Sequence, residues 1–280
     1  MNFELNEVLD FDDSLHEEFE EMGERFMPVL KESDFPATIQ SLIGLMASTN
    51  SIKLGMYDLV EECDTHLYVV KILHRTLLEQ FLRFEFLCQK FLEEESEEIG
   101  FEYRKYSKIS ETLAYVNASQ VAATMAGKST DDIVLKKLKK KYPELEITKR
   151  SLNDITGKWK HRSIIRYLTS RAKLSKDKYN FLFNIIPEYA ELSSFVHGGT
   201  SAEEYYHEIF DSGSLKHEMT SMAANACLIA ATVKSHFLVV VAKLDPSFEK
   251  DRDKIMNNIF EFACNLHNKS MQPTANASAD

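Results

Sequence analysis

The chain is poor in the residues that break helices, with only 9 glycines and 6 prolines among 280 residues. Sheets of short strands need many turns, and turns draw on glycine and proline. This scarcity argues against a β-sandwich. The long segments between turn signals instead repeat apolar residues three and four positions apart, the period of an amphipathic helix. We therefore predict an all-α fold, an antiparallel bundle of roughly 8–10 helices.

Cysteines are also few, and no two of them are spaced as zinc ligands. The four, Cys63, Cys88, Cys227 and Cys264, lie far apart inside apolar helical patterns. That placement is typical of free buried thiols in a reducing compartment. The acidic N-terminus lacks the basic flank and continuous apolar run of a secretory signal. We predict a cytoplasmic protein.

Long uninterrupted apolar runs are missing as well. The best candidate for a membrane span, residues 222–242, is interrupted by Lys234, Ser235 and His236. A helix buried between neighbouring helices has the same composition. We predict a core helix and no membrane association.

Familiar nucleotide and metal motifs do not occur. The string 126–129, Ala-Gly-Lys-Ser, ends like a phosphate-binding loop, but Ala122 stands where that loop needs its first glycine. Glu204 and His207 form one Glu-x-x-His pair, whereas carboxylate-bridged metal bundles use two. We predict no metal and no cofactor.

Charge is unevenly distributed along the chain. The net charge is −11, yet residues 136–178 hold 15 Lys and Arg against 4 Asp and Glu, which gives +11 there and −22 elsewhere. This segment is either a solvated basic hairpin, a partner for the acidic helices, or a binding surface for a polyanion such as RNA. We predict one helical domain over residues 1–267, with a basic lobe or insertion at 136–178 and a disordered tail at 268–280.

Capping residues and turn signals define the expected helices. A kink or break is expected at Pro187, and Gly127 and Gly198 are expected to end helices. The expected helices span residues 14–30, 36–62, 66–95, 102–125, 129–143, 148–172 as one or two basic helices, 178–196, 201–211, 214–244 and 246–268.

One polar stripe runs along the strongly apolar helix expected at 66–95. Lys71, Arg75, Glu79 and Arg83 recur every four residues and share one side of it. One interpretation is a solvated edge held by a surface ion pair of little energetic value. The apolar residues interspersed among these charges favour a second interpretation, a stripe that is at least partly covered.

A second cluster precedes a pair of glycines. Ser193 and His197 lie four residues apart on one helix face, after Tyr189 and before Gly198. A histidine at a helix C-terminus is favoured by the helix dipole alone, and Gly198 or Gly199 would supply the cap. The same placement also suits a histidine that titrates in a functional site.

At these two segments the chain resembles a family of helical bacterial proteins classified as a domain of unknown function. The shared pieces are Arg-x-x-x-Glu, here 75–79, and Tyr-x-x-Leu-Ser-x-x-x-His-Gly, here 189–198, and the likeness covers about residues 64–199. The resemblance implies that Arg75, Glu79, Tyr189, Ser193 and His197 converge.

A looser similarity connects the chain to HEPN-type helical ribonucleases, which carry an arginine four to six residues before a histidine on one helix. Here residues 191–193 contain no arginine, so the arginine and the histidine would come from different helices. The C-terminal residues 272–280 resemble read-through of an integron recombination site, which implies a mobile accessory protein of the resistance, toxin or phage-defence kind.

Two hypotheses follow. As an enzyme, the protein cleaves RNA without metal: His197 is the general acid or base, Arg75 stabilises the phosphorane, Glu79 orients Arg75, and Tyr189 and Ser193 position the ligand. RNA would bind along the basic segment. The expected RNA-binding residues are Lys139, Lys140, Lys141, Lys158, Trp159, Lys160 and Arg162.

The alternative is a module without catalysis. The same polar residues then form a buried network that keeps helices in register or holds an anion, while charged faces recruit a partner protein or a second copy. The two hypotheses differ in solvent access, because catalysis needs an open cleft at Arg75 and His197.

Overall fold

The protein is described from a computed structural model. The structure describes residues 4–62, 66–127, 133–143, 148, 151–152, 156–174 and 182–271. Across these ranges the chain is helical and contains no strand. The all-α prediction is therefore confirmed.

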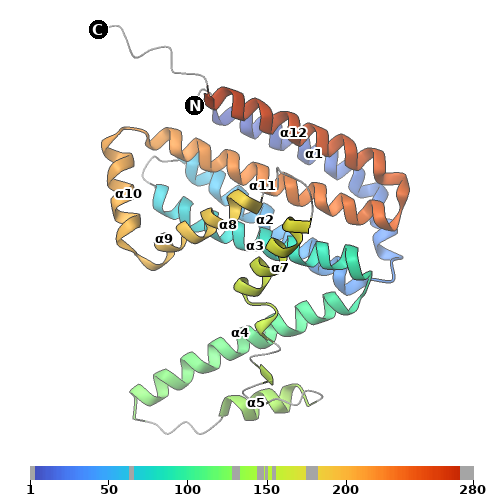
Figure 1. Ribbon diagram of the computed structural model, residues 1–280, viewed down its shortest axis with the longest axis vertical. Helices are drawn as coiled ribbons and strands as arrows, with labels where there is room; N and C mark the ends of the chain where they lie inside the picture. Colours follow the sequence, from blue (N-terminus) through green and yellow to red (C-terminus); the bar gives the residue numbers. More distant parts are fainter. Residues whose placement is uncertain are drawn as a thin grey trace.

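Long helices dominate the chain (Figure 1). In order they are α1 (Leu5–Lys31), α2 (Pro36–Glu62), α3 (Leu67–Glu94), α4 (Glu98–Met125), α5 (Ile133–Lys141), α7 (His161–Leu174), α8 (Leu182–Glu191), α9 (Ser193–His197), α10 (Thr200–Asp211), α11 (Leu215–Leu244), the 3₁₀ turn η2 (Pro246–Phe248) and α12 (Glu249–Met271).

Several helix ends agree with the expected signals. Gly127 and Gly198 follow α4 and α9 with φ of 69° and 64°, the left-handed conformation that glycine adopts without strain. The first helix begins before the expected Ser14, because Glu4 and Glu7 form a capping box. Helix α12 continues to Met271, and the rest of the predicted tail, 272–280, lies outside the described residues.

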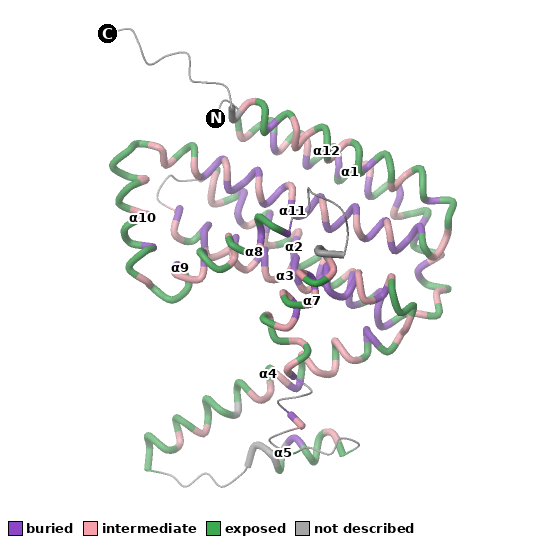
Figure 2. Tube along the Cα trace, in the orientation of Figure 1, coloured by how far each residue is buried: buried purple, intermediate pink, exposed green. Residues whose placement is uncertain are grey.

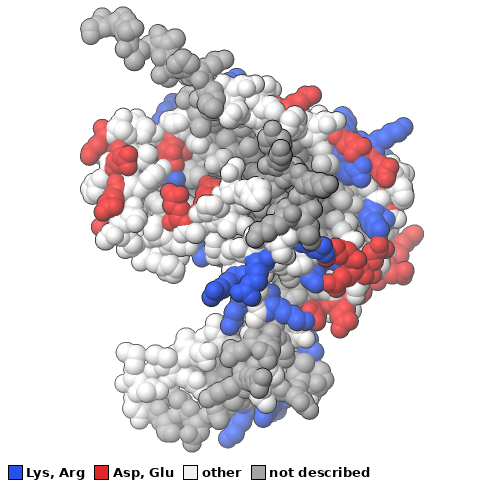
Figure 3. All heavy atoms as spheres, viewed as in Figure 1, with Lys and Arg blue, Asp and Glu red and all other residues white. Residues whose placement is uncertain are grey.

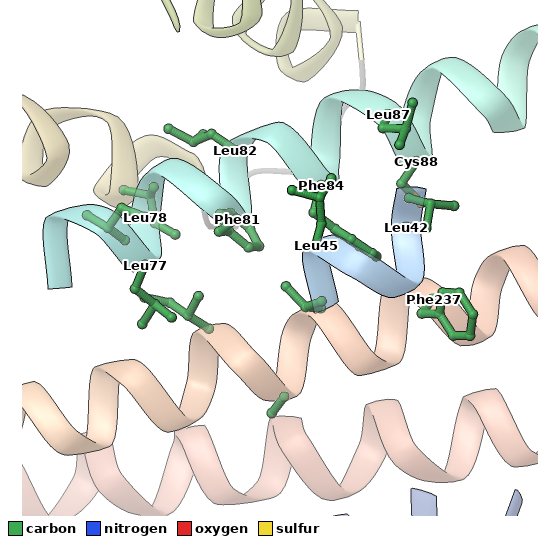
Figure 4. Close-up of a cluster of buried hydrophobic side chains, with 14 of the residues drawn as sticks. Leu42, Leu45, Leu77, Leu78, Phe81, Leu82, Phe84, Leu87, Cys88 and Phe237 are labelled. Carbon is green, nitrogen blue, oxygen red and sulfur yellow. The ribbon is translucent and has the colours of Figure 1, made fainter. Parts of the chain in front are cut away.

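Helix α11 lies at the centre of the bundle and packs against α1, α2, α3 and α12. Its buried positions alternate small residues such as Ala226 and Ala230 with large ones such as Phe237 and Leu238, which lets neighbouring helices approach closely. Figure 4 shows Phe237 and side chains of α2 and α3, among them Leu42 and Phe84, within this core. The core therefore joins segments far apart in the sequence.

Among the described residues, α11 is the one helix long and apolar enough to cross a membrane. In its most apolar window, 67 % of the residues are buried against the rest of the chain. The core helix of a bundle meets the same criteria of length and composition, so these features are weak evidence for a span.

The base of α4 is held against the start of α2. The Glu97 carboxylate accepts hydrogen bonds from the backbone N–H groups of Ala37 (2.5 Å) and Thr38 (3.1 Å), two of the donors that a helix N-terminus leaves unpaired. A Cβ atom on Gly100 would lie 2.2 Å from the backbone nitrogen of Thr38. Only glycine permits this approach of α4 to α2.

Beyond its base, α4 leaves the bundle and projects into solvent, accompanied by α5 (Figure 2). A small separate cluster of Ile109, Leu138 and Leu152 joins α5 to α4. The basic segment 136–178 is thus divided: α5 lies in this projection, whereas α7 packs against α3 through Ile164 and Leu168, which belong to the main core.

Candidate functional site

The stripe on α3 passes from covered to half-exposed along the helix. The exposed fractions of the side chains are 9 % for Lys71, 17 % for Arg75, 24 % for Glu79 and 35 % for Arg83. Helices α7, α8 and α9 pack on this side of α3, and Tyr205 of α10 reaches Lys71, which is why charges on a surface-like pattern become covered. The stripe is therefore a set of contacts between helices and not a solvated edge.

Arg75 is the centre of these contacts. One terminal nitrogen donates to the Tyr189 hydroxyl at 2.8 Å, the other to Glu79 at 3.2 Å, and Nε lies 3.4 Å from Ser193 Oγ. The guanidinium carbon also lies 4.7 Å from the centroid of the Tyr189 ring. The planar, permanently charged fork of arginine suits this combination of hydrogen bonding and stacking.

Glu79 links a second arginine to the first. One of its carboxylate oxygens accepts from Arg75, and the other accepts from Arg83 at 2.6 Å. The two guanidinium groups together carry one more positive charge than the carboxylate neutralises. Both pairs are four residues apart on α3, so local helix geometry arranges them.

His161, at the first residue of α7, completes the group. Its ring lies against the Tyr189 ring, with centroids 3.9 Å apart and planes tilted by 31°, and neither ring nitrogen has a hydrogen-bond partner. Burial, together with the charges of Arg83 and Arg75 and against the effect of Glu79, lowers the pKa of His161 to about 4. The imidazole is therefore neutral at neutral pH.

We call this group the Arg75 cluster; its members are Arg75, Glu79, Arg83, His161, Tyr189 and Ser193. The sequence indicated all of them as candidates or as part of the stripe except His161. That histidine stands between Lys160 and Arg162 in the basic segment, and no spacing relates it to Tyr189. Only the packing of α7 beside α8 brings the two rings together.

A second polar group lies one helical turn before Arg75 on α3, around Lys71. Lys71 Nζ donates to Glu218 at 2.6 Å and to the Tyr205 hydroxyl at 3.1 Å, and Tyr205 also donates to Glu218. Burial raises the pKa of Glu218, but the charge and hydrogen bond of Lys71 outweigh it and lower the pKa overall. This group ties α10 and α11 to α3.

Between the two groups lies a histidine and carboxylate pair. His74 is fully buried, and its Nδ1 lies 3.4 Å from Glu188 on α8. Burial, with the charge of Lys71, lowers the pKa of His74 to about 3, while burial raises the pKa of Glu188 to about 7 despite Lys71. Both groups are therefore held toward their neutral forms.

His197 does not join the Arg75 cluster. It is exposed at the end of α9, and among the described residues it makes no hydrogen bond or ion pair. Ser193, at the start of α9, is already at the limit of reach of Arg75. His197 lies one helical turn further along α9. The predicted convergence thus brings together Arg75, Glu79, Tyr189 and Ser193 without His197.

The predicted RNA-binding residues fall into two places. Lys139, Lys140 and Lys141 are exposed at the end of α5, and Lys158, Lys160 and Arg162 are exposed around the start of α7. Figure 3 shows Lys and Arg side chains gathered where the bundle meets the projection, close to an acidic region. The two sets are separated along the chain by residues that are only partly described.

Trp159 is a packing residue. Its ring meets Phe86 and Tyr103 edge-on, each with centroids 5.2 Å apart, and its Nε1 is buried without a hydrogen-bond partner. With Phe86 and Tyr167 it lines a cavity of about 580 Å³ between α3, α4 and α7, which contains no member of the Arg75 cluster.

No protein-family model matches the chain, and no curated protein or solved structure is significantly similar to it. The likeness to a helical bacterial family and to HEPN-type ribonucleases therefore stays a prediction. Across the described residues, no three His, Cys, Asp or Glu side chains are grouped as ligands for a metal ion.

Proposed function

We propose that this chain is a non-enzymatic helical interaction module, in which the Arg75 cluster keeps the covering helices in register on α3. The observation that carries the proposal is the state of Arg75: Glu79, Tyr189 and Ser193 engage all three of its guanidinium nitrogens. An arginine that stabilises a reacting phosphate needs free donors aimed at the substrate. Here three of the five N–H donors of Arg75 are used within the protein, one from each nitrogen.

The position of His197 supports the same proposal. The catalytic hypothesis requires an imidazole and a guanidinium within reach of one phosphate. His197 is exposed and without a described partner, while Arg75 is mostly covered. A buried network that joins α3 to α8 and α9 instead specifies how the helices fit together.

The proposal is tested with RNA. Total RNA is incubated with purified protein, and RNA integrity is also followed in cells that express wild type, Arg75→Ala or His197→Ala. We expect intact RNA and equal growth with all three proteins, and a loss of stability in Arg75→Ala alone. RNA cleavage by wild type that disappears in a variant with unchanged circular dichroism would contradict the proposal.

One observation favours RNA cleavage as a second candidate function. His161 presents a neutral imidazole with two unpartnered nitrogens beside the Arg75 and Arg83 pair. A neutral imidazole is the form that accepts a proton from a ribose 2′-hydroxyl, and two guanidinium groups suit a phosphorane. The exposed Lys160 and Arg162 flank His161 in the chain and would contact the phosphate backbone.

His161 distinguishes the two candidates. If the protein cleaves RNA through this histidine, His161→Asn abolishes cleavage and leaves the fold intact, whereas His197→Ala retains full cleavage. If the module proposal holds, neither variant changes RNA integrity. His197→Ala is the matched control because it removes an imidazole that lies outside the Arg75 cluster.

A further inference from the structure

The outer half of α4, residues 112–127, presents large apolar side chains to solvent, and we call it the α4 arm. Tyr115 is 74 % exposed, Val121 61 % and Met125 85 %. Side chains of this size are normally covered in a folded chain, and a contiguous exposed apolar face marks an interaction surface. The arm projects from the bundle (Figure 2), so no described helix of the chain covers this face.

The apolar residues of the arm are spaced as in a coiled coil. Ala114, Ala118, Val121 and Met125 follow one another at intervals of four, three and four, and all are exposed; we call them the arm seam. Tyr115 and Ala122 flank the seam on the same side. An apolar repeat of this period forms a stripe that packs into the matching stripe of another helix.

The opposite side of the helix is already occupied. Leu113 and Ile109 face α5, where they pack with Leu138. On a helix of 3.6 residues per turn, Leu113 lies about 110° and Ile109 about 150° around the helix from the middle of the arm seam. The side of α4 that packs on α5 is therefore distinct from the seam, and no described residue covers the seam.

The absence of charge on the α4 arm indicates which kind of partner it can bind. Residues 112–127 include no Asp, Glu, Lys or Arg, and in Figure 3 the region of the arm tip shows neither acidic nor basic side chains. Such a face has no cation to attract RNA and no charge to select a charged protein. The seam of a second copy has the same spacing of apolar residues, so two seams can pack against each other. No like charges would then face each other across the contact.

We propose that two copies of this chain associate through their arm seams, with the two α4 helices antiparallel. A two-fold axis between Ala118 and Val121 pairs each with the other residue on the partner copy and makes the contact isologous. Antiparallel pairing also places the helical bundles of the two copies at opposite ends of the contact. This reduces repulsion, because the bundles carry most of the negative charge. The inference rests on the proposed function in that it names the partner of the interaction module.

The size of the seam determines how tightly the copies bind. Its span of about three helical turns is shorter than the three to four heptads of a self-sufficient coiled coil. Two such helices with a width of about 10 Å bury roughly 800 Å² in total, which is below the roughly 1,200 Å² of a stable specific interface and typical of a weak association. The association is therefore reversible and depends on protein concentration.

Analytical ultracentrifugation of the full chain over a series of concentrations tests the proposal. We expect a reversible monomer–dimer equilibrium that Val121→Glu and Met125→Glu each weaken by at least about tenfold, because each places a charge in the seam. Phe260→Glu is the matched control: it changes a side chain of similar exposure, 69 %, on α12. Circular dichroism checks that every variant folds.

Salt and cross-linking add independent readouts. Added NaCl should strengthen the dimer, since it screens repulsion between two chains of charge −11. Mixed Ala118→Cys and Val121→Cys chains should cross-link to each other more readily than either does to itself. A monomer at every concentration, an equal effect of Phe260→Glu, or a dimer that salt dissociates would overturn the proposal.

The experiments can refute the dimer and the proposed function independently. Loss of RNA integrity that depends on His161 would refute the module without bearing on the seam. A monomeric chain that leaves RNA intact would refute the second copy as partner and leave the module in place.

Discussion

Arg75 illustrates how a single side chain can join three helices. Its side chain reaches Tyr189 on α8 and Ser193 on α9 while its own helix supplies Glu79. A lysine has the same charge but lacks the planar fork, and could not make the three contacts together with the stacking on Tyr189. The identity of the residue therefore matters more than its charge.

Removing this side chain should be costly. Arg75→Ala leaves the Tyr189 hydroxyl without its partner and leaves Glu79 with Arg83 alone. We expect a loss of about 1–3 kcal/mol in the free energy of unfolding. Arg75→Lys should lose less than Arg75→Ala. Urea unfolding measures both, with His197→Ala as an exposed control expected within about 0.5 kcal/mol of wild type. Unchanged stability of Arg75→Ala would show that the cluster does not hold the helices.

Glu188 should make stability depend on pH. Its pKa in the folded chain is about 7, above the usual 4.5, because burial disfavours the carboxylate. The folded chain thus holds this proton more tightly than the unfolded chain does. The resulting stabilisation is complete below about pH 4.5 and is lost as the pH rises to about 7.

Glu188→Gln isolates this effect because an amide does not ionise. Relative to wild type, the variant should gain stability steadily between pH 4.5 and 7 and gain no more above that range. The midpoints of urea unfolding across this range measure the difference in stability between the variant and wild type. His74 and His161 titrate in both proteins, so their contributions largely cancel in this difference. Parallel curves for the two proteins would show that Glu188 ionises normally in the folded chain.

At the scale of elements, helix α3 carries the stripe, but the helices that cover it decide what the stripe does. The pattern of one charge every four residues arises from the α3 sequence itself. Its coverage depends on α8 and α9, which pack on α3 although they lie more than 80 residues later in the chain. Helix α8 continues through Pro187, where a kink or break was expected, and ends at Glu191 before α9 begins at Ser193.

Gly100 should be the least replaceable glycine in these helices. Gly100→Ala would place a Cβ atom 2.2 Å from the α2 backbone, which cannot move away as a side chain would. We expect a loss of at least about 1–3 kcal/mol. Gly44→Ala in α2 is the matched control, with no atom within 4 Å of its Cβ. It should stabilise by about 0.5–1 kcal/mol, and thermal unfolding of both variants tests the contrast.

At the scale of the whole molecule, the described residues form one large core, a small second cluster around Val8 and Cys227 within the bundle, and one small outlying cluster. The main core is organised around α11, whereas Ile109, Leu138 and Leu152 form the separate cluster between α4 and α5. A region with few buried apolar contacts opens at lower free energy than the rest. The α4 arm and α5 should therefore exchange amide hydrogens before the bundle does.

Two leucines with no exposed surface test this hierarchy. Leu238→Ala, in α11, should lower the free energy of global unfolding by about 2–5 kcal/mol. Leu138→Ala, in α5, should instead speed hydrogen exchange in α4 beyond Glu111 and in α5, and leave the exchange of α11 unchanged. Hydrogen exchange followed by mass spectrometry reports both. Equal slowing or speeding across all helices in both variants would mean that the chain opens as one unit.

The sequence by itself determined the helical class, most helix ends and the polar residues of α3, because helix period, capping and charge spacing are local properties. Tyr189 and Ser193 were expected beside Arg75 from a short motif within one segment. His161 was not, and His197 was placed beside Arg75 on the strength of a motif. Those two assignments depended on how distant helices pack, which no local pattern encodes. Only the tertiary structure decided which histidine meets Arg75, and that the uncharged half of α4 stands free of the bundle.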